Sequence, residues 1–219
     1  MTDLAQMQMD VPPGTLKVVI LDYGGVLAEE GFLQGMAAIA GANGLQPVAV
    51  QQAGTEAIHR SGYVTGRGTE QAFWSLFRSN TGITWDDQRL RQQILSRFVL
   101  HPGVLACVRE VRRQGILTAI LSDQTDWLDE LDARDGFFKD FDYVFNSYRR
   151  GKTKRDASVF GDVLGELGVG PAEAIFVDDK LGHVQRARSR GMLGIVYRDE
   201  ASLVRTLKTM AKARSGVTR

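Results

Sequence analysis

Short apolar runs recur along the chain, and each is followed by polar residues and then by an amphipathic stretch. The runs occupy residues 18–21, 116–121, 143–145, 175–177 and 194–197. Their nearly continuous apolarity and their β-branched residues are typical of strands that are buried on both faces of a parallel sheet. The pattern therefore predicts five buried strands that other elements separate.

The stretches between these runs have helical periodicity. Residues 103–115 (GVLACVREVRRQG), 157–168 (ASVFGDVLGELG) and 181–191 (LGHVQRARSRG) each end on glycine, as many helices do. Strands that alternate with helices favour an α/β fold with a doubly wound, mainly parallel sheet. We therefore expect a Rossmann-like core.

Residues 31–98 interrupt this alternation, because they contain helical patterns and no convincing strand. Thr69 precedes an apolar helical face in TEQAFWSLFRS and is a typical N-cap residue. Residues 85–98 form a second pattern, with Asp86 and Asp87 at its positive end. We predict a flexible lead-in of residues 1–14, an α/β core of residues 15–30 and 99–219, and an inserted helical cap of residues 31–98.

The net charge of +1 predicts no electrostatic attraction to nucleic acid or to anionic membranes. No run approaches the roughly 18 apolar residues of a membrane helix, and the first residues lack the basic and apolar regions of a secretory signal. Cys107 is the single cysteine, and VLACVREV places it on the apolar side of a helix as an inert thiol. We expect a cytoplasmic monomer or homodimer that binds neither nucleic acid nor membranes.

Polar residues that can carry chemistry directly follow the predicted strands. They are Asp22, Ser122, Asp123, Asp178 and Asp179, with Lys152 and Lys154 in the basic loop SYRRGKTK. The carboxyl ends of parallel strands share one edge of a sheet, so these side chains should converge. Clustered carboxylates repel one another unless a cation such as Mg²⁺, which prefers oxygen ligands, lies between them. With a lysine and a hydroxyl, the set indicates a phosphoryl-transfer site in which an aspartate can be the nucleophile.

Four stretches in this order resemble the motifs of the haloacid dehalogenase superfamily, in its capped subfamily I. They are VVILDYGGVL, ILSD, GKTKRDASVF and FVDDKLGHV, and the resemblance spans roughly residues 17–208. The third departs from the usual K-P-D-P pattern but keeps the lysine. The resemblance implies a hydrolase with Mg²⁺ as cofactor and a small phosphorylated molecule as substrate. It implies Asp22, Ser122 and Lys154 as catalytic residues, Ser122, Asp123 and Lys154 as phosphate ligands, and Asp22, the Gly24 carbonyl, Asp178 and Asp179 as metal ligands.

Gly24 departs from many phosphatases of this family, which carry a second aspartate two residues after the nucleophile. A glycine keeps the backbone carbonyl but removes an acid–base side chain that typically contributes ~10²–10⁴-fold in rate. The substrate can have a good leaving group, such as an acyl or anomeric sugar phosphate. Alternatively, a residue of the cap or near Glu29 and Glu30 supplies the proton, or catalysis has been lost. A D-x-G start, with GRGTEQAF (66–73) and the alanine of KRDA, is similar to a subset that looks like sugar-phosphate phosphatases.

Other interpretations of the same residues stay open. A dehalogenase also lacks the second acid, but its chemistry needs no Mg²⁺ and the family branch has no paired aspartates such as Asp178 and Asp179. A phosphomutase needs the acid–base group that Gly24 lacks, and a non-catalytic binding protein could keep the site as a relic. Taken singly, the motif residues could be helix caps and a solvated basic loop.

His183 is expected on a helix surface, and His59 is only a possible cap contact. The interpretation we favour is a Mg²⁺-dependent phosphatase of a small metabolite, with an aspartyl-phosphate intermediate.

Overall fold

The computed structural model describes residues 16–215, with side chains to residue 211. Five strands form one sheet in the order β3-β2-β1-β4-β5, and every neighbouring pair is parallel. The strands are β1 (Val18–Leu21), β2 (Leu117–Ser122), β3 (Tyr143–Asn146), β4 (Ala174–Asp178) and β5 (Leu193–Val196). The predicted doubly wound parallel sheet is confirmed. The predicted lead-in of residues 1–14 lies outside the described residues.

Three strands, β2, β3 and β4, extend one residue beyond the apolar runs that predicted them, and two of them thereby include predicted site residues. Ser122 is the last residue of β2 and pairs with Asn146, and Asp178 is the last residue of β4 and pairs with Val196. Backbone pairing with a neighbouring strand fixes these two polar residues, which sequence patterning placed just after the strands. Their side chains therefore stand on a rigid sheet edge and not in a loop.

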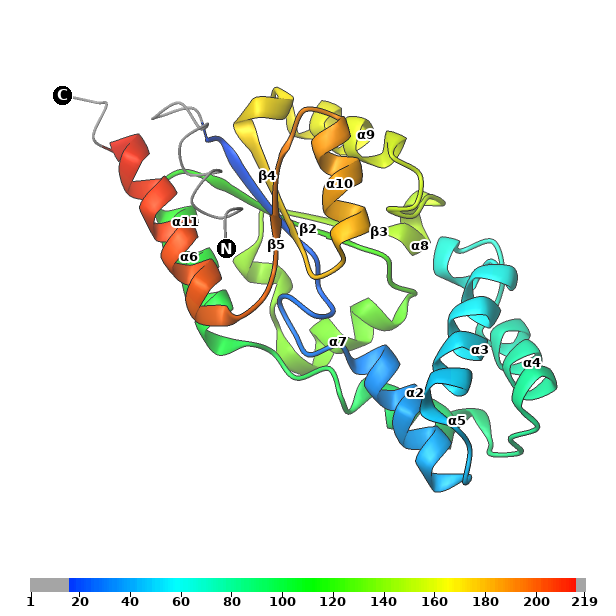
Figure 1. Ribbon diagram of the computed structural model, residues 1–219. Coiled ribbons are helices and arrows are strands. Elements are labelled where there is room, and N and C mark those ends of the chain that lie inside the picture. Colours follow the sequence, from blue (N-terminus) through cyan, green and yellow to red (C-terminus); the bar gives the residue numbers. More distant parts are fainter. Residues whose placement is uncertain (1–15, 216–219) are drawn as a thin grey trace.

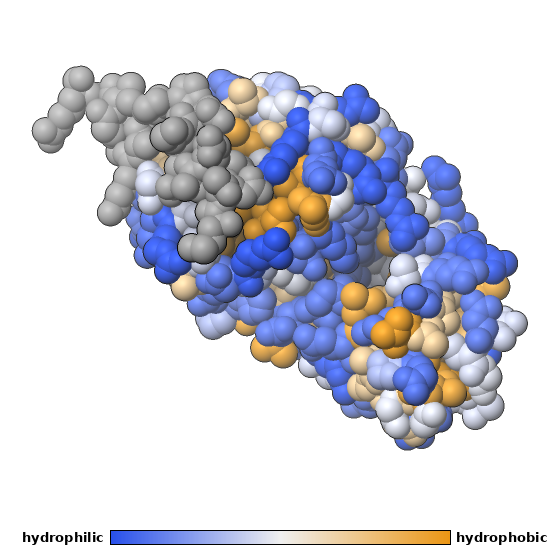
Figure 2. Space-filling model, viewed as in Figure 1, coloured by the Kyte–Doolittle hydropathy of each residue, from blue (hydrophilic) through white to orange (hydrophobic). Residues whose placement is uncertain are grey.

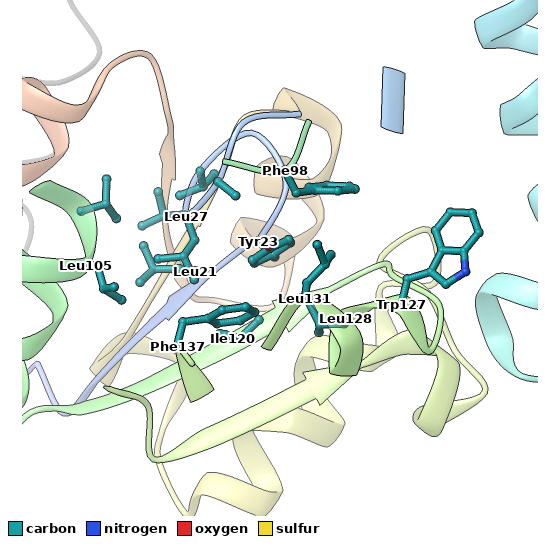
Figure 3. Packing of buried hydrophobic residues seen from close by; sticks show 14 of the residues in the cluster. Leu21, Tyr23, Leu27, Phe98, Leu105, Ile120, Trp127, Leu128, Leu131 and Phe137 are labelled. Atoms are coloured by element: carbon teal, nitrogen blue, oxygen red, sulfur yellow. The ribbon is translucent and has the colours of Figure 1, made fainter. Parts of the chain in front are cut away.

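Helices cover both faces of the sheet, as Figure 1 shows. Val19 and Leu21 belong to the apolar cluster that includes α6 (Pro102–Arg113), α7 (Trp127–Asp135) and α11 (Glu200–Ser215). Val18 and Ile20 belong to a second cluster with α9 (Ser158–Leu167) and α10 (Leu181–Ser189). This division follows from the two-residue period of a strand, which sends alternate side chains to opposite faces. Figure 3 shows the first cluster, where Leu21, Ile120 and Leu105 pack together.

A helical segment lies between β1 and α6. It contains α2 (Gly31–Ala42), α3 (Pro47–Arg60), α4 (Glu70–Thr81), α5 (Asp87–Leu95) and the short 3₁₀ helix η1 (Tyr63–Thr65). In Figure 1 these helices gather beyond the end of the sheet. Thr69 caps α4, accepting a 3.2 Å hydrogen bond from Ala72 N as expected. The helix expected over residues 85–98 is shorter, because Asp86 accepts from Arg89 N and caps α5 one residue before it begins.

Aromatic side chains join the helical segment to the core. The ring of Trp127, at the start of α7, lies 5.9 Å from Tyr63, 6.1 Å from Phe73 and 5.9 Å from Trp74, measured between centroids. Tyr63 also donates its hydroxyl to Asp126. All four rings are almost fully buried, so this contact fixes the segment above the strand ends. Division of the chain into a separate cap and core at residues 31 and 98 stays a prediction.

The remaining elements are short, and they connect the layers. They are η2 (Phe138–Asp140), α8 (Ser147–Arg150) and η3 (Pro171–Glu173). Cys107 is 2% exposed on α6, which confirms its expected burial, and burial raises the pKa of its thiol; its inertness stays a prediction. Among residues 16–215, no helix combines the length and the apolarity needed to cross a membrane.

Candidate active site

Lys154 lies between two carboxylates at the carboxyl edge of the sheet. Its Nζ is 2.7 Å from Asp22 Oδ2 and 2.6 Å from Asp178 Oδ2. The three residues are 1%, 4% and 0% exposed. A solvated basic loop is therefore the wrong interpretation of Lys154. The interpretation as a solvated loop residue does fit Lys152, because its ammonium is partly exposed and pairs with Asp162 at 2.5 Å. Two buried carboxylates share one buried ammonium.

Burial and pairing act in opposite directions on these charges. Burial by itself raises the pKa of Asp178, but Lys154 and His183 outweigh it and hold that pKa below its ordinary value. Burial likewise disfavours a charged Lys154, yet Asp22 and Asp178 raise the pKa of its ammonium. The pKa of Asp22 is raised, because burial and the nearby Asp178 outweigh the attraction of Lys154. Burial thus opposes the charge of Asp22, whereas pairing with Lys154 and His183 maintains the charge of Asp178.

Asp179 completes a group of three acids. One carboxylate oxygen from each of Asp22, Asp178 and Asp179 lies within 4.8 Å of the others. Asp179 Oδ1 is shielded from solvent and has no hydrogen-bond partner among the described residues. Three ionised acids beside Lys154, with Lys180 as the next ammonium, leave an excess of negative charge in a confined space. This donor set, made of hard oxygens with one left unsatisfied, fits a divalent cation such as Mg²⁺.

The two glycines after Asp22 and Tyr23 have different roles. Gly25 has φ +81°, and a Cβ there would lie 2.8 Å from Asp179 Cγ, so both the backbone and the close approach of Asp179 require glycine. Gly24 has no such restriction. A Cβ at Gly24 would lie 3.4 Å from a side-chain atom of Phe98 and 4.0 Å from Glu30 Oε1. Local space therefore allows a side chain at residue 24.

Ser122 and Asp123 reach the same place from β2. Ser122 is 2% exposed, and both residues line the cavity beside Asp22. Asp123 Oδ1 accepts a 2.8 Å hydrogen bond from the backbone N of Lys154, so it ties the β2 loop to the lysine loop. This bond gives Asp123 a positioning role. Its predicted contact with phosphate stays a prediction.

Asn146 and Ser147 support the β2 loop, and sequence analysis missed both. Asn146 Nδ2 donates to Thr125 O at 2.8 Å, and Ser147 Oγ lies 3.1 Å from Gln124 O and 2.7 Å from Val64 O. Both side chains are buried. Their position directly after the β3 run was the available signal, because the other strand ends supplied the predicted site.

A cavity of about 270 Å³ lies over these strand ends. Figure 2 shows the surface hollowed between the α/β core and the helical segment. The helical segment contributes mainly apolar side chains and two polar ones, namely Phe32, Leu33, Ile58, Val64, Thr55 and His59. The core contributes Asp22, Gly24, Ser122, Asp123, Gln124, Lys154, Arg155, Lys180 and His183, and Glu30 comes from the connection before α2. One wall is therefore apolar and the other is charged.

The predicted position of His183 is wrong. Its Nδ1 is 3.1 Å from Asp178 Oδ2, and its side chain is 13% exposed. Because α10 starts directly after β4, its first turn brings His183 back over the strand end.

His59 lines the cavity, where burial and the nearby Arg155 lower its pKa. Lys180 also lines it and was missed, although it directly follows the predicted Asp178-Asp179 pair.

The family model of the haloacid dehalogenase-like hydrolases matches residues 16–189. The chain belongs to this family. Rat (Rattus norvegicus) bifunctional epoxide hydrolase 2 is 30% identical over 124 residues, which cover 53% of this chain and 22% of that protein. Sesquiterpene phosphatase astK of Aspergillus oryzae is 36% identical over 70 residues, 32% of this chain and 36% of that protein. The matched segments thus span well under half of these relatives.

Solved structures of the family share the fold. The enzyme bt-2542 of Bacteroides thetaiotaomicron, in complex with magnesium and inorganic phosphate, gives a TM-score of 0.66 at 20% identity. The match covers 86% of this chain and 98% of that one. The L-2-haloacid dehalogenase of Xanthobacter autotrophicus gives a TM-score of 0.63 at 20% identity. This match covers 91% of this chain and 87% of the dehalogenase. Because a phosphate complex and a dehalogenase fit about equally well, the fold does not choose between these reactions.

Proposed function

We propose that the protein is a Mg²⁺-dependent phosphatase of a small phosphorylated metabolite. The observation that carries this proposal is the buried ammonium of Lys154, which joins Asp22 to Asp178 beside the unpaired oxygen of Asp179. A nucleophilic carboxylate, a metal-binding pair and a lysine together suit the attack on a phosphoryl group. In a family of hydrolases, this combination favours phosphoric monoesters.

Mg²⁺ fits the donor set described above. Asp22, the Gly24 carbonyl and Asp179 would hold it, with Asp178 in support. When bound, the ion offsets the excess negative charge and polarises the phosphoryl oxygens. The magnesium and phosphate in the structure of bt-2542 support this choice.

The residues of this chain divide the remaining work. Asp22 attacks phosphorus in line and forms an aspartyl phosphate, which water then hydrolyses. Lys154 and Ser122 orient the phosphoryl oxygens, and Asp123 holds the backbone of Lys154 in place. The helical segment excludes water from the reacting groups and contacts the leaving group through its apolar wall.

The cavity suits a small substrate. A volume of about 270 Å³ lies near the lower end of ligand pockets, which span roughly 300–1,000 Å³. Sugar phosphates are the class we favour, because the D-x-G start and GRGTEQAF look like those of sugar-phosphate phosphatases. A cytoplasmic monomer or homodimer that binds no nucleic acid stays our expectation.

A dehalogenase is the second candidate, favoured by Gly24, since carbon–halogen displacement needs no acid at that position. The unpaired oxygen of Asp179 argues against it. A metal-free reaction would leave this carboxylate without a role. A relic binding site is disfavoured by the buried ion pair of Asp22 with Lys154, because keeping charges away from water costs stability without a function in return.

A phosphatase assay distinguishes these functions. Wild type, Asp22→Asn and the surface control Asp162→Asn are incubated with sugar and acyl phosphates and Mg²⁺. We expect phosphate release from wild type and Asp162→Asn, and a loss of at least ~10³-fold in Asp22→Asn, the usual scale for a lost nucleophile. If all three proteins are equally inactive on every compound, the proposed enzymatic function is refuted. Chloride release from 2-chloropropionate without metal would support the dehalogenase.

A further inference from the structure

The carboxyl group of Glu30 lies near Gly24, the residue at the position of the missing acid. Its Oε1 is 4.0 Å from the position that a Cβ at residue 24 would occupy. Glu30 also lines the same cavity as Asp22, and its side chain is 22% exposed.

The two oxygens of Glu30 have different surroundings. Oε2 accepts a 2.7 Å hydrogen bond from Leu33 N, which caps α2 and holds the side chain in place. Oε1 lies 3.8 Å from Lys180 Nζ, and both residues line the cavity. Burial raises the pKa of Glu30, and Asp179 adds to this, whereas Lys180 and the Leu33 N–H act in the opposite direction. The net result is a fixed carboxyl group that holds a proton more readily than an exposed glutamate.

Other carboxyl groups in the cavity are engaged elsewhere. In the described part of the chain, Asp22 bonds to the Lys154 ammonium, and Asp123 accepts from the Lys154 backbone. Glu29 is close in sequence but does not line the cavity. Its oxygens contact Gln34 and His101. Glu30 is therefore the carboxyl group best placed to exchange a proton with a substrate.

We propose that Glu30 is the general acid and base of this site and replaces the side chain that Gly24 lacks. This inference rests on the proposed phosphatase function. In the first step Asp22 forms a bond to phosphorus, the bond from phosphorus to the leaving oxygen breaks, and the Glu30 proton moves to that oxygen. In the second step water attacks phosphorus and gives its proton to Glu30. The bond to Asp22 then breaks, which releases inorganic phosphate and restores both carboxyl groups.

The test compares Glu30→Gln with the matched control Glu29→Gln on two substrates. One is 4-nitrophenyl phosphate, whose leaving group needs no proton, and the other is a sugar 6-phosphate, whose leaving group does. Because kcat/KM reports the first step, we expect Glu30→Gln to lower it by ~10²–10⁴-fold for the sugar phosphate and by less than tenfold for 4-nitrophenyl phosphate. Glu29→Gln should leave both values within about twofold. Glu30→Gln should also show a burst of nitrophenolate before a slow steady state, since water attack has lost its base.

A rescue variant separates catalysis from the capping of α2. Gly24→Asp, whose Cβ would meet nothing closer than 3.4 Å, is combined with Glu30→Ala, which vacates the neighbouring space, and we expect most of the kcat/KM that Glu30→Ala loses on the sugar phosphate to return. Equal losses on both substrates without rescue would show that Glu30 only caps the helix and would overturn the inference. If Glu30→Gln does not fold, Glu30→Asp gives the same comparison with the carboxyl group withdrawn by one methylene. A wild type that is inert on both substrates would instead refute the proposed function.

Discussion

Lys154 Nζ lies 2.6 Å from Asp178 Oδ2, and both side chains are almost completely excluded from solvent. Their sequence separation is 24 residues, and the lysine reaches the β4 end from the loop that follows α8. Because Asp22 adds a second carboxylate to the same ammonium, this lysine balances charge at the centre of the site.

Replacement of Lys154 by methionine should therefore destabilise the protein at neutral pH. The change leaves two buried carboxylates without their partner, which typically costs about 3–5 kcal/mol in the free energy of unfolding. Lys152→Met, which alters a partly exposed pair two residues away, should cost less than about 1 kcal/mol. Urea unfolding in EDTA at pH 8 measures both values.

The pH dependence of Lys154→Met has a defined sign. Without the ammonium, burial raises the pKa of both carboxyl groups in the folded state above their unfolded values. They then cost stability when ionised, and this cost disappears as the pH falls and they take up protons. The difference in the free energy of unfolding between wild type and Lys154→Met should therefore become smaller from pH 8 to pH 5.5. A difference that widens on acidification would contradict the buried arrangement.

Gly25 and Gly24 should respond differently to alanine. Gly25→Ala adds a Cβ 2.8 Å from Asp179 Cγ at φ +81°, a conformation that costs an L-residue roughly 1–2 kcal/mol before the clash is counted. Gly24→Ala meets only a 3.4 Å contact with the side chain of Phe98, which is near ordinary van der Waals distance, and should change stability by less than about 1 kcal/mol. Melting temperatures of the two variants provide the comparison, and equal values would refute this distinction.

Asp179 should determine how strongly Mg²⁺ stabilises the fold. A ligand that binds only the folded state raises the melting temperature, and at a given concentration the rise grows with the logarithm of its affinity. Asp179→Asn removes one anionic ligand and should lower Mg²⁺ affinity at least ~10-fold, as losses at metal sites commonly do. Asp156→Asn, which alters an exposed carboxylate, is the control. If Mg²⁺ shifts the melting temperatures of both variants and of wild type equally, Asp179 is not a ligand.

Trp127 should be the main energetic link between the helical segment and the core. It is fully buried against Tyr63, Phe73 and Trp74, and truncation of such a residue to alanine costs about 3–5 kcal/mol. Trp85 is half-buried under Arg89, so Trp85→Ala should cost less than half as much. Denaturant unfolding followed by fluorescence checks both changes. A small effect at Trp127 would mean that the segment docks through other contacts.

Local pattern was enough to predict much of this fold. The apolar runs predicted five strands, glycine marked helix ends, and Thr69 and Asp86 marked helix starts, because each signal acts within a few residues. Resemblance to a family directed attention to Asp22, Lys154 and the aspartate pair. The structure brings all of these to one cavity or its edge.

The sequence by itself thus determined the fold class, the family and the residues at the strand ends that can take part in catalysis or bind ligands. Only the tertiary structure decided which of these residues meet. The sharing of Lys154 between Asp22 and Asp178, the return of His183 to the β4 end, and the approach of Glu30 to Gly24 depend on loop paths. Periodicity describes one element at a time, whereas these contacts arise from packing between elements that are distant in the chain, or from turns whose direction that packing sets.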